Sequence, residues 1–144
     1  MSEHAVLNAN YLRHKIIEEA NEQGVSHLFA DGAPVDVVKH EFTLSMAPMK
    51  ESMGLGAMDV AKGLLDKGYM APTVYFPLVV PECMMIEPTE TESKEVLDEF
   101  ARKFVEVLQE DPDVLHNAPI TTKVRRVDEV YAARNLTLSY QFDE

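Results

Sequence analysis

The sequence predicts a single α+β domain, a two-layer α/β sandwich that spans residues 1–144. Apolar residues recur at helical spacing in some segments and alternate in others, in the order helix, strand, helix, strand, strand, helix. A chain of 144 residues that is 46% hydrophobic is long enough to bury one core. A doubly wound fold would need more strands than this length supplies, and no repeat, low-complexity tract or flexible linker divides the chain.

The first third of the chain is expected to hold a helix, a loop and a strand. Apolar residues across 2–23 follow helical spacing, and Gly24 is placed to end that helix. Glycine, aspartate, serine and proline then predict a loop over 25–34. Residues 38–46 alternate between apolar and polar, which is typical of a half-buried strand and puts His40 on its apolar face.

The middle of the chain predicts a loop, a helix and a pair of extended segments. Residues 49–56, with two glycines, are expected to form a mobile loop, and the apolar stripe in 57–67 predicts a helix that ends at Gly68. The segments 73–80 and 83–86 are rich in apolar and strand-forming residues. Because prolines forbid an uninterrupted central ladder there, the pattern fits two strands joined at a tight corner or one strand with a bulge.

A long helix is expected to begin near residues 89–93 and to end before Pro112. Its apolar residues form one stripe at helical spacing: Val96, Leu97, Phe100, Ala101, Phe104, Val105 and Leu108. Thr89, Thr91 and Ser93 are all candidates for the residue that caps its first turn.

The last quarter is expected to contain a turn or short helix over 112–117, a short helix over 128–134 and a final strand over 136–140. Between them lies the only basic cluster of the chain, around Arg125 and Arg126. Its partner could be a carboxylate, a phosphate or an acidic patch of the chain itself. Internal pairing is the simplest interpretation.

Composition excludes several classes of function. The 25 acidic residues exceed the 13 basic ones, and the formal net charge of -12 repels nucleic-acid backbones and anionic lipid. The longest uncharged stretch, 68–81, is too short to span a bilayer, and the first residues do not resemble a secretory signal. We therefore expect a cytoplasmic chain without nucleic-acid or membrane partners, whose single cysteine, Cys83, is a buried thiol.

No short motif predicts catalysis or a metal site. None of the five histidines has a partner at the spacing of zinc ligands, so no metal is expected. The glycines at Gly54 and Gly56 lack the other residues of a nucleotide-binding loop. On an apolar face His40 would need a hydrogen-bond partner, and it could be either a structural histidine or a site residue.

Longer stretches of the sequence indicate a protein family more specifically than these short motifs do. In order along the chain they are Leu7-Asn-Ala-Asn-Tyr-Leu12, His40-Glu41-Phe42, Asp59-Val-Ala-Lys-Gly-Leu-Leu-Asp-Lys-Gly68, Ala71-Pro-Thr-Val-Tyr-Phe-Pro77, Ile86-Glu-Pro-Thr-Glu-Thr-Glu-Ser-Lys-Glu95, Leu97-Asp98 and Val124-Arg-Arg-Val-Asp-Glu129. Together they resemble the C-terminal end of glycine dehydrogenase (decarboxylating), the P-protein of the glycine cleavage system, and in particular its bacterial subunit 2. Lys123 stands where the resemblance leads us to expect proline.

The resemblance implies the small C-terminal domain of a fold-type-I pyridoxal phosphate (PLP) enzyme. Such an enzyme decarboxylates glycine and passes the aminomethyl group to the lipoyl arm of H-protein. The cofactor lysine would belong to a large domain that precedes residue 1, so no PLP is expected on this chain alone. The implied partners are that large domain or subunit 1, together with lipoyl H-protein, and the isolated chain is expected to be inactive.

The resemblance also suggests which face meets the large domain. The candidate residues of that face are His40, Thr73, Glu87, Thr89 and Glu90. A domain separated from such a partner should expose apolar surface, with residues 69–80 the first suspect, and could then self-associate. The alternative is a freestanding α/β regulatory or binding module that dimerises through its sheet.

Overall fold

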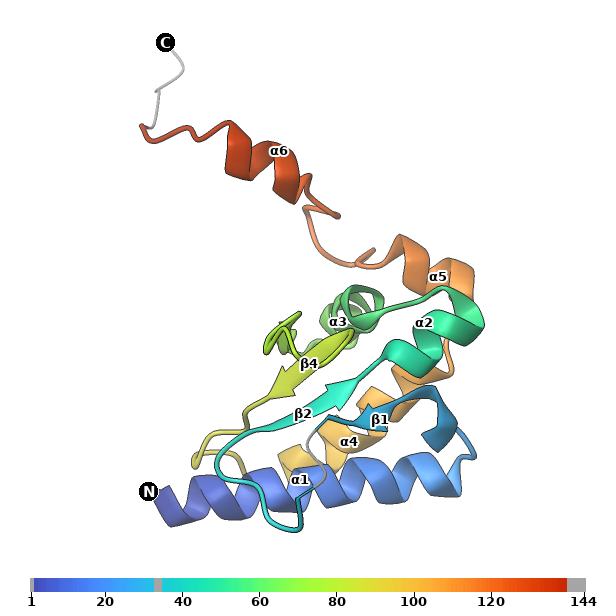
Figure 1. The fold of residues 1–144 in the computed structure, drawn as a ribbon, viewed down its shortest axis with the longest axis vertical. Coiled ribbons are helices and arrows are strands. Elements are labelled where there is room, and N and C mark those ends of the chain that lie inside the picture. The colour runs from blue at the N-terminus through green and yellow to red at the C-terminus, as the bar shows by residue number, and fades with distance from the viewer. Residues whose placement is uncertain (1, 33–34, 140–144) are drawn as a thin grey trace.

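The structure, a computed structural model, describes residues 2–32 and 35–139 (Figure 1). Within these residues four strands form one antiparallel sheet, in the order β1 (Ala30–Asp31), β2 (Phe42–Ser45), β4 (Cys83–Ile86) and β3 (Thr73–Val74). Helices pack against this sheet, so the predicted α+β class with two layers is confirmed.

The central strands are buried on both faces. Leu44 of β2 pairs with Met84 of β4, and both side chains face the core with no exposed surface. Thr43 and Ser45, which alternate with Leu44, are also buried. Ser45 Oγ donates a hydrogen bond of 2.6 Å to the carbonyl of Pro81, in the loop that covers the second face. The expectation of a half-buried strand is therefore wrong, because that loop shields the polar side.

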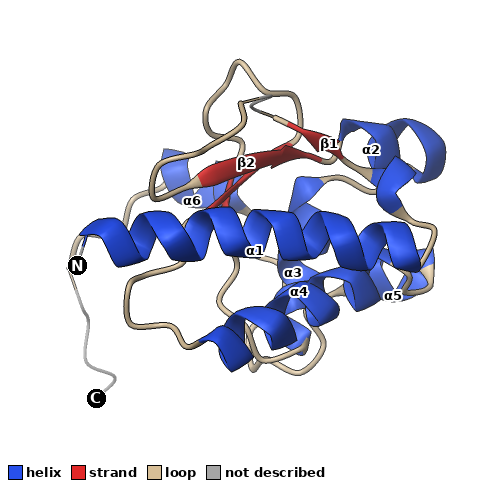
Figure 2. Cartoon of the chain, turned by 90° about the horizontal axis from the view of Figure 1, so that it is seen from below, coloured by secondary structure: helices blue, strands red, loops and turns tan. Residues whose placement is uncertain are grey.

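Helices α1 (Ser2–Glu22) and α4 (Lys94–Leu108) lie side by side along one face of the sheet (Figures 1 and 2). Their apolar stripes supply much of the core, with Ala9, Leu12, Ile16, Ala20, Leu97, Ala101, Phe104, Val105 and Leu108. Both helices are in the predicted positions because their apolar periodicity is long and regular.

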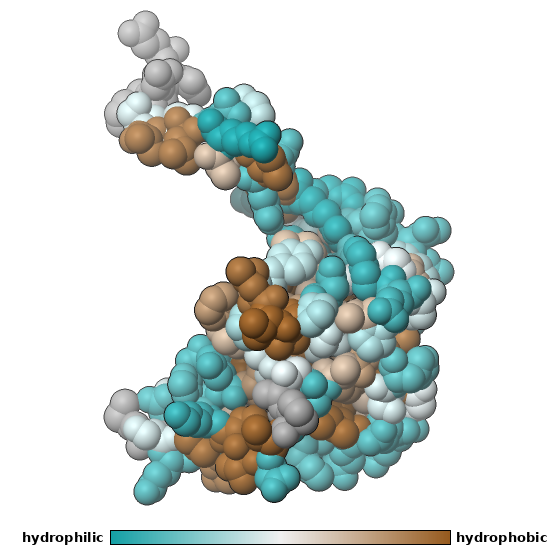
Figure 3. All heavy atoms as spheres, viewed as in Figure 1, coloured by the Kyte–Doolittle hydropathy of each residue, from teal (hydrophilic) through white to brown (hydrophobic). Residues whose placement is uncertain are grey.

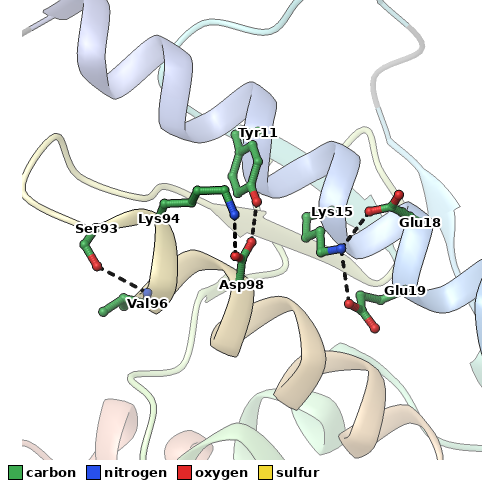
Figure 4. Close-up of polar contacts among 8 residues, drawn as sticks. All are labelled: Tyr11, Lys15, Glu18, Glu19, Ser93, Lys94, Val96 and Asp98. Atoms are coloured by element: carbon green, nitrogen blue, oxygen red, sulfur yellow. Dashed lines mark hydrogen bonds and ion pairs between the residues drawn. The ribbon is translucent and has the colours of Figure 1, made fainter.

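Polar contacts also join the two long helices (Figure 4). Asp98 accepts hydrogen bonds from Tyr11 of α1 and from Lys94 of its own helix, the latter at 2.6 Å. The Lys94 ammonium, together with the Tyr11 hydroxyl, holds the pKa of Asp98 below its usual value. Ser93 Oγ accepts a hydrogen bond of 3.4 Å from the backbone N–H of Val96, which makes Ser93 the cap of α4.

The remaining helices of the described chain are η1, a 3-10 turn (Ser26–Leu28), α2 (Ala47–Met53), α3 (Ala57–Asp66), α5 (Pro112–Asn117) and α6 (Glu129–Arg134). Helix α2 occupies most of the segment expected to be a mobile loop, 49–56. Pro48 suits its first turn, Met49 is buried, and Gly54 ends it with a φ of 75°. The two glycines that suggested a loop thus follow a helix.

Several strand predictions need correction. The strand expected over 38–46 is confined to β2, and His40 lies before it, exposed rather than on an apolar face. The segment 73–80 forms only the two residues of β3, because prolines interrupt it, and a loop then leads into β4. Strand β1 lies in an expected loop. Residues 136–139 form no strand, and Tyr140 lies outside the described residues.

Candidate functional site

The loop before β2 and the loop after β4 meet beside the first turn of α1. Here His40 Nε2 lies 3.7 Å from Glu87 Oε1, and both side chains are about half exposed. The sequence placed His40 on a buried face, whereas the structure gives it an acidic neighbour at the surface. When protonated, the imidazole and the carboxylate form an ion pair that solvent can reach.

Two asparagines of α1 hold these loops in place. Asn8 is buried, and its Nδ2 donates hydrogen bonds to the carbonyls of Thr89, at 2.8 Å, and Glu92, at 3.2 Å. Asn10 Nδ2 donates to the carbonyl of Val38 at 2.8 Å, and its Oδ1 accepts from the N–H of the same residue at 2.9 Å. Sequence reasoning did not assign these asparagines, although both lie in the string Leu7-Asn-Ala-Asn-Tyr-Leu12 that carries the family resemblance.

Two adjoining hollows open around the loops. The first, of about 430 Å³, is lined by His40, Glu87, Thr89 and Glu90 together with the start of α1. The second, of about 420 Å³, is lined by Thr73 and again by Glu87 and Thr89. The structure thus brings all five candidate residues to two hollows that share one wall.

The walls of the second hollow are mostly apolar. Tyr69 and Phe100 meet edge to face there, with ring centroids 5.3 Å apart, and Met70 and Met85 add further apolar surface. Burial raises the pKa of the Tyr69 hydroxyl above its usual value. An apolar group with a cationic or hydrogen-bond-donating end would find both an apolar wall and the Glu87 carboxylate.

These residues form no recognisable catalytic or metal centre by themselves. Among the described residues, no group of three or more histidine, cysteine, aspartate or glutamate side chains is placed to hold a metal ion. The imidazole and the carboxylates of the first hollow can accept or donate protons. Thr89 also lines this hollow, and its hydroxyl hydrogen-bonds to that of Thr91 at 2.7 Å.

The basic cluster lies elsewhere and pairs within the chain. Arg126 Nη2 lies 2.8 Å from Asp59 Oδ1, and its guanidinium also donates to the carbonyls of Leu115 and Ala118. Arg125 donates to a carbonyl at the end of α5. Internal pairing therefore accounts for Arg126, and no anionic ligand is needed to explain it.

The structure also bears on expectations from composition. Cys83 is fully buried, as predicted, and this burial raises the pKa of its thiol. In the part of the chain that the structure describes, every helix is too short or too polar to cross a lipid bilayer.

Comparison with known proteins identifies the family to which the chain is similar. A family model described as "Glycine dehydrogenase, C-terminal domain" matches residues 1–128. The chain is 49% identical over 144 residues to a protein of Nitrosospira multiformis, covering 98% of this chain and 27% of the relative. It is 50% identical over 145 residues to a protein of Exiguobacterium sibiricum, covering 98% of this chain and 27% of the relative.

Both relatives carry the name "Probable glycine dehydrogenase (decarboxylating) subunit 2". A protein of Desulforamulus reducens has the same name and is 49% identical over 138 residues, covering 93% of this chain and 26% of the relative. The chain thus spans about 27% of the length of these curated relatives. The chain belongs to the family of glycine dehydrogenase C-terminal domains, in the form found in subunit 2.

Proposed function

We propose that this chain serves as the small domain of a PLP-dependent glycine dehydrogenase (decarboxylating). In this role it covers the active site of a larger PLP domain and has no activity alone. The complete enzyme would decarboxylate glycine and transfer the aminomethyl group to lipoyl H-protein. The observation that carries the proposal is the match of 98% of this chain to subunit 2 of Nitrosospira multiformis at 49% identity.

The residues present do not fit PLP itself. The cofactor requires a lysine enclosed against a phosphate site and an acidic partner for its ring nitrogen. All eight lysines are at least partly exposed, and Lys39 is the only one of them that borders either hollow. We therefore assign no PLP site to this chain and expect the cofactor lysine in the larger domain.

The five candidate residues are proposed to line the face that meets the large domain. Their support is geometric: His40, Glu87 and Glu90 lie at the surface, on loops that α1 holds by hydrogen bonds. Preformed and solvent-accessible polar groups are expected where one domain closes on another. Glu87 borders both hollows, and we propose that it contributes most among them to the closed site.

A chimeric subunit tests the proposal. It consists of the Nitrosospira multiformis subunit 2 with its own C-terminal domain replaced by this chain, and it is assayed with subunit 1, PLP and lipoyl H-protein. The measurement is exchange of the glycine carboxyl carbon with labelled bicarbonate. We expect exchange by the chimeric subunit and none by the same subunit lacking the domain.

A matched pair of variants examines the proposed face. Glu87→Gln in the chimeric subunit should lower the exchange rate by roughly tenfold, which corresponds to about 1.4 kcal/mol, whereas Glu51→Gln, at an exposed position of α2, should leave it unchanged. If this chain alone binds PLP through a lysine and catalyses exchange, the proposed division of labour is wrong. It is equally wrong if the chimeric subunit exchanges no faster than the truncated one.

A further inference from the structure

The loop between β3 and β4 exposes a row of apolar side chains. Phe76 is 57% exposed, Leu78 is 86% exposed and Val79 is 88% exposed. Monomeric proteins rarely leave contiguous apolar patches of this kind uncovered. We call residues 75–80 the apolar loop.

A second apolar element begins after α5, where residues 120–139 form the tail. Its root is firmly attached: Asp66 accepts hydrogen bonds from the backbone N–H groups of Ile120 and Thr121 and from the Thr121 hydroxyl. Burial alone would raise the pKa of Asp66, but these hydrogen bonds hold it below its usual value. Arg126, through its ion pair with the buried Asp59, attaches the tail a second time.

Beyond Arg126 the tail leaves the body of the domain (Figure 1). Its apolar side chains are all largely exposed, namely Val127, Val130, Tyr131, Leu136 and Leu138. The start of the tail is held by hydrogen bonds to a charged group, but its apolar side chains make little contact with the rest of the domain. Such a segment is suited to pack against another protein surface.

The apolar loop and the tail border the same concave side of the molecule. Figure 3 shows apolar atoms in the middle of that side and again on the tail, with a hollow between them. Tyr75, at the start of the loop, has its pKa raised by burial and by the carboxylates of Glu82, Asp59 and Glu129.

The charge of the tail differs from that of the body. Residues 120–139 carry four cations and two anions, in a chain whose formal net charge is -12. Lys123 and Arg134 of the tail form no ion pair with any described residue. The partner surface should therefore be apolar, with carboxylates opposite these two cations.

Resting on the proposed function, we propose that the apolar loop and the tail form a clasp that grips the larger remaining part of subunit 2. The relatives supply an occupant of sufficient size, because this chain accounts for only 26–28% of their length. Two separated apolar elements around a hollow fit a folded surface that enters between them. The clasp thus docks the small domain, while the His40 and Glu87 loops remain at its side for the active site.

Cysteine labelling measures whether the clasp is occupied. Leu78→Cys and Leu138→Cys are introduced separately into the isolated chain and into the chimeric subunit, and their rates of reaction with a maleimide are compared. The native Cys83 is fully buried and gives little background. At concentrations low enough to keep the isolated chain monomeric, we expect both new thiols to react rapidly in that chain and roughly tenfold or more slowly in the chimeric subunit.

Lys50→Cys, at an exposed position of α2, is the control and should react equally fast in both proteins. Equal labelling of Leu78→Cys and Leu138→Cys in both proteins, with a folded chimeric subunit, overturns the clasp. Slowing that appears only at concentrations where the chimeric subunit dimerises identifies a second copy as the occupant, and also overturns it.

If the chimeric subunit does not fold, the remainder of the Nitrosospira multiformis subunit 2 is produced separately and added to the labelled chain. Protection of both thiols supports the clasp, and reaction at the unprotected rate contradicts it. The readout is independent of the exchange assay. If the thiols are protected but glycine exchange is absent, the proposed function is wrong and the clasp stands. If exchange occurs but the thiols are not protected, the clasp is wrong and the proposed function stands.

Discussion

Asn8 and Asn10 show how single side chains of a helix position loops distant in the sequence. Asn8 reaches Thr89, 81 residues away, and satisfies two loop carbonyls from within the protein. Asn10 pairs with both backbone groups of Val38. Because buried backbone groups must find partners, each asparagine supports one of the two loops that meet at the candidate site.

Replacing Asn8 by alanine should leave the carbonyls of Thr89 and Glu92 without their buried donor. The expected loss is about 1 to 2 kcal/mol in the free energy of unfolding, measured by urea denaturation. Asn21→Ala is the matched control, since Asn21 lies exposed on the same helix and shares the change in helix propensity. Equal stability of the two variants would contradict the role given to Asn8.

His40 illustrates what a sequence pattern can miss about one residue. Alternation placed it inside a strand, because period-two patterns extend through segments that flank a strand as well. In the structure His40 precedes β2, and its imidazole lies near Glu87 at the surface. These surroundings depend on a loop far along the chain, which the pattern around His40 does not contain.

The helix α4 shows how far local signals determine an element. Its apolar stripe predicts its position, yet any of three nearby hydroxyl residues, Thr89, Thr91 and Ser93, could have capped its first turn. The structure chooses Ser93, while the hydroxyls of Thr89 and Thr91 hydrogen-bond to each other at 2.7 Å. Asn8 holds the Thr89 and Glu92 carbonyls, so the loop just before Ser93 is fixed by contacts with α1 as well as by its own sequence.

Ser93→Ala should destabilise the protein by about 1 kcal/mol, the usual cost of losing a helix cap. Thr91→Ala, two residues earlier and outside the helix, is expected to cost much less. Thermal unfolding of both variants gives the comparison. A larger loss for Thr91→Ala would mean that the cap of α4 lies there instead.

Short elements were predicted unevenly, since α5 and α6 lie where the sequence predicted short helices, whereas α2 was missed. The two glycines that follow α2 indicated a loop, while the helix itself buries Met49 and ends at Gly54 with a φ of 75°. The strands β1 and β3 have two residues each. They exist because β2 and β4 supply hydrogen-bond partners, and no pattern within two residues can predict such partners.

On the surface of the whole molecule, the region 69–80 exposes apolar side chains, as expected, although Tyr69, Ala71 and Val74 pack against the core. Met70 and Leu78 are both more than four-fifths exposed. The tail adds a second apolar surface that sequence reasoning did not foresee, because exposure of its side chains depends on the tail leaving the body. Removal of both surfaces from water is favourable at about 25 cal/mol per Å².

The isolated chain should therefore self-associate, seen as an average mass in light scattering that rises with concentration. Leu78→Asp combined with Val79→Asp should lower the apparent association constant by roughly tenfold, a change of about 1.4 kcal/mol. Val114→Asp, at an exposed apolar position on α5, should have little effect. A monodisperse monomer across a wide concentration range would count against this prediction.

Apolar periodicity and the stretches that resemble a known family are local properties of the sequence. They therefore sufficed to predict the two long helices, the positions of the central strands, the α+β class and the family. Contacts between distant segments are not local. The meeting of His40 with Glu87, the asparagine supports and the exposed tail depend on how helices and loops pack, because each contact needs two backbones placed together. The asparagines of α1 hold the loops that carry His40 and Glu87, and Asp59 and Asp66 of α3 hold the start of the tail.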